Sequence, residues 1–287
     1  MINQKDCTII IPHLGRTKEQ CSSLHLCLES LRESVPDMPK VIVKNGDVPC
    51  TCHRDIRVVS QGQCKAVNAA IATTNTPWVF VTNDDMIYAP GWWEKLTESL
   101  ASEAITGTIS ACISPMLVEP NAGAPTFEVQ KFGGAGGDFD KEKWIEFARH
   151  YMLDKTYMDQ SLKGIRTGFN LPFLIKRELW NLIGGYDINY DPWGSNSDSD
   201  LEYKIRLAGV QPYQNTNCVV YHFSTTSGTS HPDNRPYWEK NWHYFIEKWG
   251  FERASSPEIW TADFVIPKPP VRRFNPWWEG FYNEKTV

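Results

Sequence analysis

Over roughly the first 115 residues, short β-branched runs alternate with amphipathic stretches, and this alternation constrains the fold more than any other feature. Residues 8–11 predict a buried strand that stops at Pro12. The apolar residues of 21–31 then recur at helical spacing, behind a capping-box pair formed by Thr17 and Gln20. Strands and helices that alternate in this way are typical of βαβ units around a parallel sheet. The sequence therefore predicts the α/β class.

The same pattern continues along the chain. Further strands are predicted at 41–43, 56–59, 78–81, 109–114, 173–175 and 218–221. Further helices are predicted at 66–71, 141–151, 201–208 and 237–249. Glycine and proline are frequent between 115 and 137, where no regular element is predicted.

A chain of 287 residues, 41% of them hydrophobic, can bury one large core. We expect one domain over residues 1–250, made of halves at 1–115 and 116–250, and an extended tail at 251–287. The aromatic tail is expected to pack on its own domain, with contact to an acceptor or a second subunit as the alternatives. No apolar run approaches the ~18 residues that span a bilayer, so a cytoplasmic protein is expected.

Cysteine content and charge narrow the classes of function. The eight cysteines are scattered through a chain too large to need disulfides, so reduced thiols are expected. The net charge of −5 gives no strong field toward phosphate backbones, so nucleic acid would bind only through a local patch. The twelve tryptophans suit stacking on sugar faces, and core packing explains them equally well.

The tripeptide Asn83-Asp84-Asp85 follows the apolar strand at 78–81 directly. Ligands gather at the carboxyl ends of strands in open α/β sheets, so these carboxylates are well placed to hold a hard divalent cation that bridges a diphosphate. A turn rich in Asn and Asp is an equally weighted interpretation of the tripeptide alone.

Two further polar features follow later in the chain. Asp198 lies at the start of a helical pattern, where the positive end of the helix dipole favours the ionised carboxylate that a general base requires. Ser197 and Asp200 suit the cap and first turn of the same helix, and for Asp200 a capping role is at least as well supported as catalysis. His222 ends the apolar run 218–221, where it could ligate the same cation or serve as a hydrogen-bonded structural residue.

The order of these motifs resembles glycosyltransferase family 2, whose members have the GT-A fold. The resemblance covers roughly residues 7–250. It is carried by the segments 8–12, 62–70, 83–85, 173–177, 184–187 and 198–201, and by His222. It implies a Rossmann-like, mostly parallel sheet flanked by helices, with a nucleotide-sugar half at 1–115 and an acceptor half at 116–250.

The resemblance also implies roles for individual residues. Asp198 would be the general base, and Asp85 and His222 would hold Mn²⁺ or Mg²⁺. The nucleotide-sugar side would comprise Pro12, Leu14, Arg16, Asn45, Asn68, Asn83 and Asp84, and the acceptor side Trp193 and Asp200. The chain departs from the family pattern in two places. It reads Lys44-Asn45-Gly46 where many members have an acidic residue that holds the nucleoside, and Ser197 where a glutamate often precedes the catalytic Asp.

The activity implied is an inverting transfer of a sugar from a nucleotide-sugar donor, with UDP favoured, to a hydroxyl acceptor. A saccharide or glycan is the first choice of acceptor, and a hydroxylated base in DNA, as in phage-type DNA-modifying enzymes, is the alternative. Two rival classes are a non-catalytic carbohydrate-binding protein on the same scaffold and a nucleotidyltransferase. The second would want a glycine-rich basic loop after the first strand, where this chain reads Pro12-His13-Leu14-Gly15-Arg16.

Overall fold

The computed structural model describes residues 2–15, 17–44, 62–98, 100, 111–120, 128–129, 131–153, 164–224 and 235–250. Its strands are β1 (Cys7–His13), β2 (Lys40–Lys44), β3 (Trp78–Val81), β4 (Met86–Ile87), β5 (Cys112–Glu119), β6 (Glu128–Val129), β7 (Ile165–Thr167), β8 (Phe173–Lys176) and β9 (Tyr213–His222). Its α-helices are α1 (Lys18–Ser34), α2 (Gln63–Ala72), α3 (Trp92–Glu98), α4 (Lys141–Leu153), α5 (Arg177–Ile183), α6 (Ser197–Leu207) and α7 (Arg235–Trp249). The predicted strand at 56–59 and the tail at 251–287 lie outside the described residues.

These strands form one mixed sheet in the order β2-β1-β3-β8-β5-β9-β4, with β6 beside β5 and β7 beside β9. β1 runs parallel to β2 and β3, and β5 runs parallel to β9. β8 lies between the two groups and is antiparallel to both β3 and β5. Two reversals restore the original direction, so β1, β3, β5 and β9 all point the same way.

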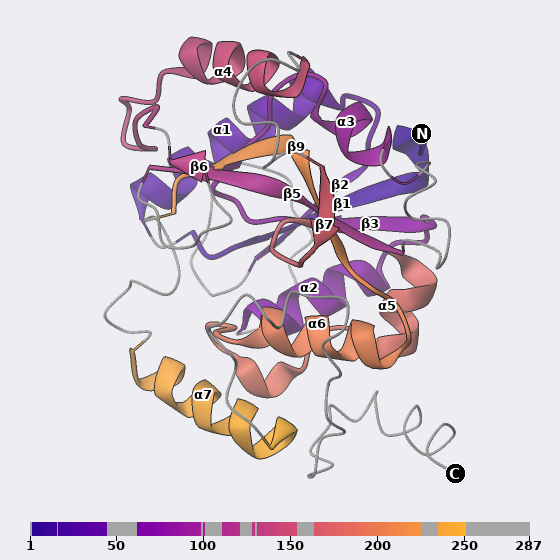
Figure 1. Ribbon diagram of the computed structural model, residues 1–287. Coiled ribbons are helices and arrows are strands. Elements are labelled where there is room, and N and C mark those ends of the chain that lie inside the picture. The colour runs from indigo at the N-terminus through magenta and orange to yellow at the C-terminus, as the bar shows by residue number, and fades with distance from the viewer. Residues whose placement is uncertain are drawn as a thin grey trace.

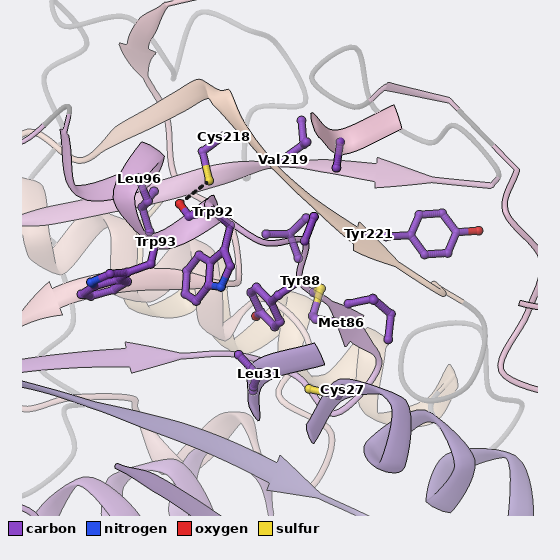
Figure 2. Packing of buried hydrophobic residues seen from close by; sticks show 14 of the residues in the cluster. Cys27, Leu31, Met86, Tyr88, Trp92, Trp93, Leu96, Cys218, Val219 and Tyr221 are labelled. Carbon is purple, nitrogen blue, oxygen red and sulfur yellow. Dashed lines mark hydrogen bonds between the residues drawn. The ribbon is translucent and has the colours of Figure 1, made fainter. Parts of the chain in front are cut away.

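Helices cover both faces of the sheet, with α1, α3 and α4 on one side and α2, α5, α6 and α7 on the other (Figure 1). On the first side, Figure 2 shows Trp92, Trp93 and Leu96 of α3 in the core, where the Cys218 thiol donates to the Trp92 carbonyl at 3.3 Å. The rings of Tyr88 and Trp92 lie 4.6 Å apart. Packing of the core therefore accounts for these aromatic residues.

The predicted start of the helix that follows residue 17 is confirmed. The capping box of Thr17 and Gln20 begins α1, with both reciprocal bonds present. The described cysteines are free thiols: Cys7, Cys21, Cys27, Cys64, Cys112 and Cys218. No helix in the described part of the chain has the length and apolar character needed to cross a membrane.

Two strands extend beyond their predicted ends, past prolines. β1 continues through Pro12 to His13, because β3 pairs with β1 only as far as Ile10 and proline is tolerated where one side of a strand lacks a partner. β5 continues through Pro115 to Glu119, with a register shift against β9 between Pro115 and Met116 that accommodates the ring. The prediction of irregular chain over 115–137 is therefore wrong as far as Glu119, and again at Glu128–Val129, which form β6.

The start of α2 depends on a residue far along the chain. Gly62, the N-cap residue, makes no side-chain cap bond and has a φ of +131°. Asp191 supplies the cap instead, accepting from the backbone N–H of Cys64 at 2.8 Å and of Lys65 at 3.0 Å. A Cβ at position 62 would lie 2.1 Å from the Asp191 carboxyl carbon, so only glycine fits. Asp191 thereby joins α2 to the segment that precedes α6.

A buried ionic cluster joins α6 to α7. Lys248 Nζ lies 2.7 Å from Asp187 Oδ2 and 2.7 Å from Asp200 Oδ1, and all three side chains are at most 1% exposed. Burial opposes the charge of Lys248, but Asp200 and Asp187 outweigh it and raise the pKa of the amine. Burial lowers the pKa of the neighbouring Lys204 to about 8, because Asp200 at 3.6 Å offsets it only in part. The contact between α6 and α7 therefore depends on buried opposite charges that stabilise one another.

We expect Lys248→Met to lower the free energy of unfolding by about 3–5 kcal/mol, because it leaves two buried carboxylates without their shared cation. Urea denaturation followed by circular dichroism measures the change. The matched control is Lys143→Met, since Lys143 also lies 2.7 Å from an aspartate, Asp140, but is 75% exposed and should leave stability almost unchanged. Equal effects of the two substitutions would contradict a structural role for the buried cluster.

Candidate active site

The common direction of β1, β3, β5 and β9 brings polar residues together at one edge of the sheet. Asp84 and Asp85 follow the end of β3, Glu119 ends β5, and His222 ends β9. β4 then turns back along β9 and pairs Met86 with His222. The Phe223 N–H donates to the Asp85 carbonyl at 3.1 Å, which holds Asp85 beside His222. The topology therefore places residues more than 100 positions apart in direct contact.

The His222 imidazole lies between two carboxylates. Its Nε2 is 3.4 Å from Asp85 Oδ2, and its Nδ1 is 2.5 Å from Glu119 Oε1. The side chains are 18% exposed for His222, 1% for Asp85 and 11% for Glu119. Burial disfavours the imidazolium, but Asp85 and Glu119 outweigh it and raise the pKa of His222 to about 10. Without a metal ion, the imidazole therefore carries a proton at neutral pH.

These residues fit a divalent cation. Two atoms that each bind one ion at about 2.1 Å lie about 3 Å apart, close to the observed separation of Asp85 Oδ2 and His222 Nε2. Glu119 occupies the other ring nitrogen, which is the usual way in which a carboxylate orients a metal-binding histidine. No group of three or more His, Cys, Asp or Glu within the described ranges is arranged to hold a metal ion. A two-residue site suits an ion whose remaining ligands come from water and phosphate oxygens.

Asp84 has a partner inside the protein. Its Oδ2 lies 2.5 Å from Nδ1 of His13, and both side chains are almost fully buried. Burial raises the pKa of Asp84, and His13 works against that rise. Gly15, with a φ of +64°, allows the chain to turn over the imidazole, since a Cβ there would lie 2.7 Å from His13 Nε2. Asp84 was predicted to lie on the nucleotide side, and its carboxylate is held by His13.

The remaining donor-side residues fall into three groups. Pro12 is buried in β1, whereas Leu14 and Asn83 are half-buried at the ends of β1 and β3. Asn68, on α2, is bound to the main chain of Tyr186. Arg16 and Asn45, which were also predicted on the nucleotide-sugar side, lie outside the described residues.

The predicted general base is held by a tyrosine. Asp198 lies in the first turn of α6 and is half-buried. Its Oδ1 accepts a hydrogen bond from the Tyr186 hydroxyl at 2.9 Å. The helix begins one residue earlier than predicted, because Asn196 is the N-cap residue, in a left-handed conformation and without a side-chain cap bond. Ser197 is thus the first helical residue and not the cap.

The two residues expected on the acceptor side differ in exposure. Trp193 is half-buried in the turn before α6. Asp200 is completely buried and binds Lys248, and its Oδ1 also accepts from the indole N–H of Trp249 at 3.0 Å. A side chain without solvent exposure cannot meet an incoming acceptor, so we assign Asp200 to the buried ionic cluster. These contacts engage the carboxylate of Asp200, which therefore does not cap α6 as predicted.

Sequence reasoning missed three residues that orient the site: Glu119, His13 and Tyr186. Glu119 fell within a stretch predicted to be irregular, so nothing placed it at the end of a strand. His13 stands at the carboxyl end of β1, which was a usable signal once the strand was extended past Pro12. Tyr186 gave no signal, because its contact with Asp198 depends on tertiary packing.

Comparison with known proteins adds to this geometry. Residues 8–147 match the family model described as Glycosyl transferase family 2. A search of curated proteins finds no match. Three solved structures share the fold at low sequence identity. This chain covers about half the length of the first of them.

The first is GalNAc-T7 with UDP, GalNAc and Mn²⁺, at a TM-score of 0.57 and 16% identity over 85% of this chain and 48% of that one. The second is the mannosyltransferase PcManGT from Pyrobaculum calidifontis with GDP-Man and Mn²⁺. Its TM-score is 0.50 and its sequence identity 14%, over 82% of this chain and 68% of that one. The third is S. aureus TarS 1-349, with a TM-score of 0.51 and a sequence identity of 11% over 76% of this chain and 60% of that one.

We expect Glu119→Gln to weaken Mn²⁺ binding by about 10- to 100-fold, because the carboxylate that orients His222 and increases its basicity is lost. Titration calorimetry with Mn²⁺ measures the change. Glu98→Gln is the matched control, since Glu98 is an exposed partner of Lys95 on α3 and should leave Mn²⁺ affinity unchanged. Wild-type affinity in Glu119→Gln would remove Glu119 from the site.

We expect Mn²⁺ affinity to rise with pH, by about tenfold per unit between pH ~6.5 and ~8.5. The sign follows from the pKa of His222, which is raised to about 10 in the metal-free protein, so the ion must displace a proton throughout this range. Calorimetry in two buffers of different ionisation enthalpy should show about one proton released per ion bound. An affinity independent of pH would show that His222 is not a ligand.

Proposed function

We propose that this chain, whose residues 8–147 match the model of glycosyl transferase family 2, transfers a sugar from a nucleotide-sugar donor to a hydroxyl acceptor with inversion at the anomeric carbon. The donor proposed is a UDP-sugar, and the acceptor a saccharide or glycan. The observation that carries the proposal is the contact of Asp85 with His222 at 3.4 Å, oriented by Glu119, at the carboxyl edge of the sheet. This is where ligands bind in open α/β folds.

Asp85 and His222 would hold the divalent ion, for which Mn²⁺ or Mg²⁺ suits a carboxylate and an imidazole. When bound, such an ion supplies positive charge that stabilises the departing diphosphate. Two of the similar structures contain Mn²⁺ together with UDP or GDP-Man, which supports both the ion and the class of donor. The sequence departure at Lys44 concerns the nucleoside side and leaves this arrangement intact.

Asp198 would accept the proton of the attacking hydroxyl group. The hydroxyl oxygen forms a bond to the anomeric carbon while the bond from that carbon to the diphosphate oxygen breaks, and the diphosphate leaves with the electron pair. Attack from the face opposite the leaving group inverts the configuration. A base held in place ahead of the reaction contributes about 10²- to 10⁴-fold to the rate. The half-buried position of Asp198 leaves part of its surface for an acceptor.

The proposal predicts different losses for two carboxylates. Asp198→Asn should keep the rise in melting temperature that UDP and Mn²⁺ give together, while release of nucleoside diphosphate from the donor falls by about 10²- to 10⁴-fold. Asp85→Asn should lose the thermal shift itself, because the ion is no longer held. The measurements are thermal melts with UDP or GDP, with and without Mn²⁺, and a coupled assay of diphosphate release from UDP-sugars and GDP-mannose.

Two results would contradict the proposal. One is a thermal shift that is equally large without metal, and the other is an Asp198→Asn variant that stays within about twofold of wild-type turnover. The anomeric configuration of the released sugar, read by NMR at early times, separates inversion from retention. Transfer of labelled sugar to hydroxymethylated DNA instead of to saccharides would change the acceptor class and keep the donor chemistry.

A further inference from the structure

We propose that Tyr186 is the positioning residue for the general base, and that it ties the orientation of Asp198 to helix α2. This inference rests on the proposed function, in which Asp198 accepts the proton. The Tyr186 hydroxyl donates to Asp198 Oδ1 at 2.9 Å. A carboxylate held at one oxygen is restrained from rotating, so its second oxygen keeps one direction. A base must keep such a direction to meet the acceptor hydroxyl.

The Tyr186 ring is fixed by the core. The residue is 2% exposed, and its ring packs edge-on against Trp180 with the centroids 5.6 Å apart. It also packs edge-on against Phe173, which lies in β8 of the central sheet, with the centroids 6.4 Å apart. A ring enclosed in this way has one orientation, so its hydroxyl delivers its hydrogen bond to a fixed point.

The Tyr186 backbone is held as firmly as its ring. Asn68 Nδ2 donates to the Tyr186 carbonyl at 2.8 Å, and the Tyr186 N–H donates to Asn68 Oδ1 at 2.9 Å. The preceding carbonyl, of Gly185, accepts from the Lys204 ammonium group. Gly185 has a φ of +64°, and a Cβ there would lie 2.6 Å from Asn68 Oδ1. The absence of a side chain at Gly185 lets Asn68 reach the main chain.

These contacts form one continuous path between two helices. Asn68 belongs to α2, which follows β1 and β2 along the chain, and Asp198 belongs to α6. Both helices lie on the same face of the sheet (Figure 1). Asn68 locks the backbone of Tyr186, and Tyr186 locks the carboxylate of Asp198. Asn68, which was predicted to lie on the donor side, therefore also helps to position the proposed base, Asp198.

The test is Tyr186→Phe, which removes one oxygen and keeps the ring. We expect kcat for diphosphate release from UDP-sugars or GDP-mannose to fall by about 10- to 100-fold, with the donor KM and the Kd of the nucleotide within about twofold of wild type. The selective loss of kcat is the signature of a displaced base, since a general loosening of the fold would also weaken donor binding. Asp198→Asn, measured alongside, sets the full effect of losing the base.

Tyr190→Phe is the matched control. Tyr190 is equally buried, and its hydroxyl lies 3.4 Å from Oδ1 of Asp200 on the same helix, so this variant removes the same group from a carboxylate outside the proposed chemistry. Tyr190→Phe should keep wild-type kcat. Equal losses of kcat in the two variants, or wild-type kcat in Tyr186→Phe while Asp198→Asn is inactive, would overturn the inference alone. Full activity of Asp198→Asn, or no diphosphate release by the wild type, would overturn the proposed function and this inference with it.

Discussion

The insertion of one antiparallel strand is the constraint on which the rest of this structure depends. β8 reverses direction between β3 and β5, and β5 reverses it again, so strands from both halves of the chain end at the same edge. Without that second reversal, His222 would end at the opposite edge from Asp85. The 3.4 Å contact between them is therefore a consequence of strand direction, and the loops only complete it.

The sequence was sufficient for the elements that have strong local signals. Hydrophobic periodicity and the capping box predicted α1, and β-branched runs predicted β2, β3 and β8. The order of motifs predicted the GT-A fold, which the similar structures share, and the resemblance to glycosyltransferase family 2, whose family model matches residues 8–147. Asp85 and His222 were predicted together, and the structure brings their side chains into contact.

The parts that the sequence could not reveal are those decided by tertiary packing. Prolines at positions 12 and 115 hid the ends of two strands, because the pairing that tolerates a proline is visible only in the sheet. Asp198 and Asp200 stand two residues apart in similar local sequence. Packing of α7 buries Asp200 against Lys248 and leaves Asp198 half-exposed beside Tyr186. Local sequence alone could not separate the carboxylate proposed as the base from the one in the buried ionic cluster.

The bond between Asp191 and the start of α2 has a consequence for how this protein can vary. Any side chain at Gly62 would occupy the space of the Asp191 carboxylate, and loss of that carboxylate would leave two amide groups of α2 uncapped. The two positions are constrained as a pair although 129 positions separate their numbers, 62 and 191. A chimera that joins the first half of this chain to the second half of a relative would therefore keep this contact only if the relative supplies an aspartate at the position of Asp191.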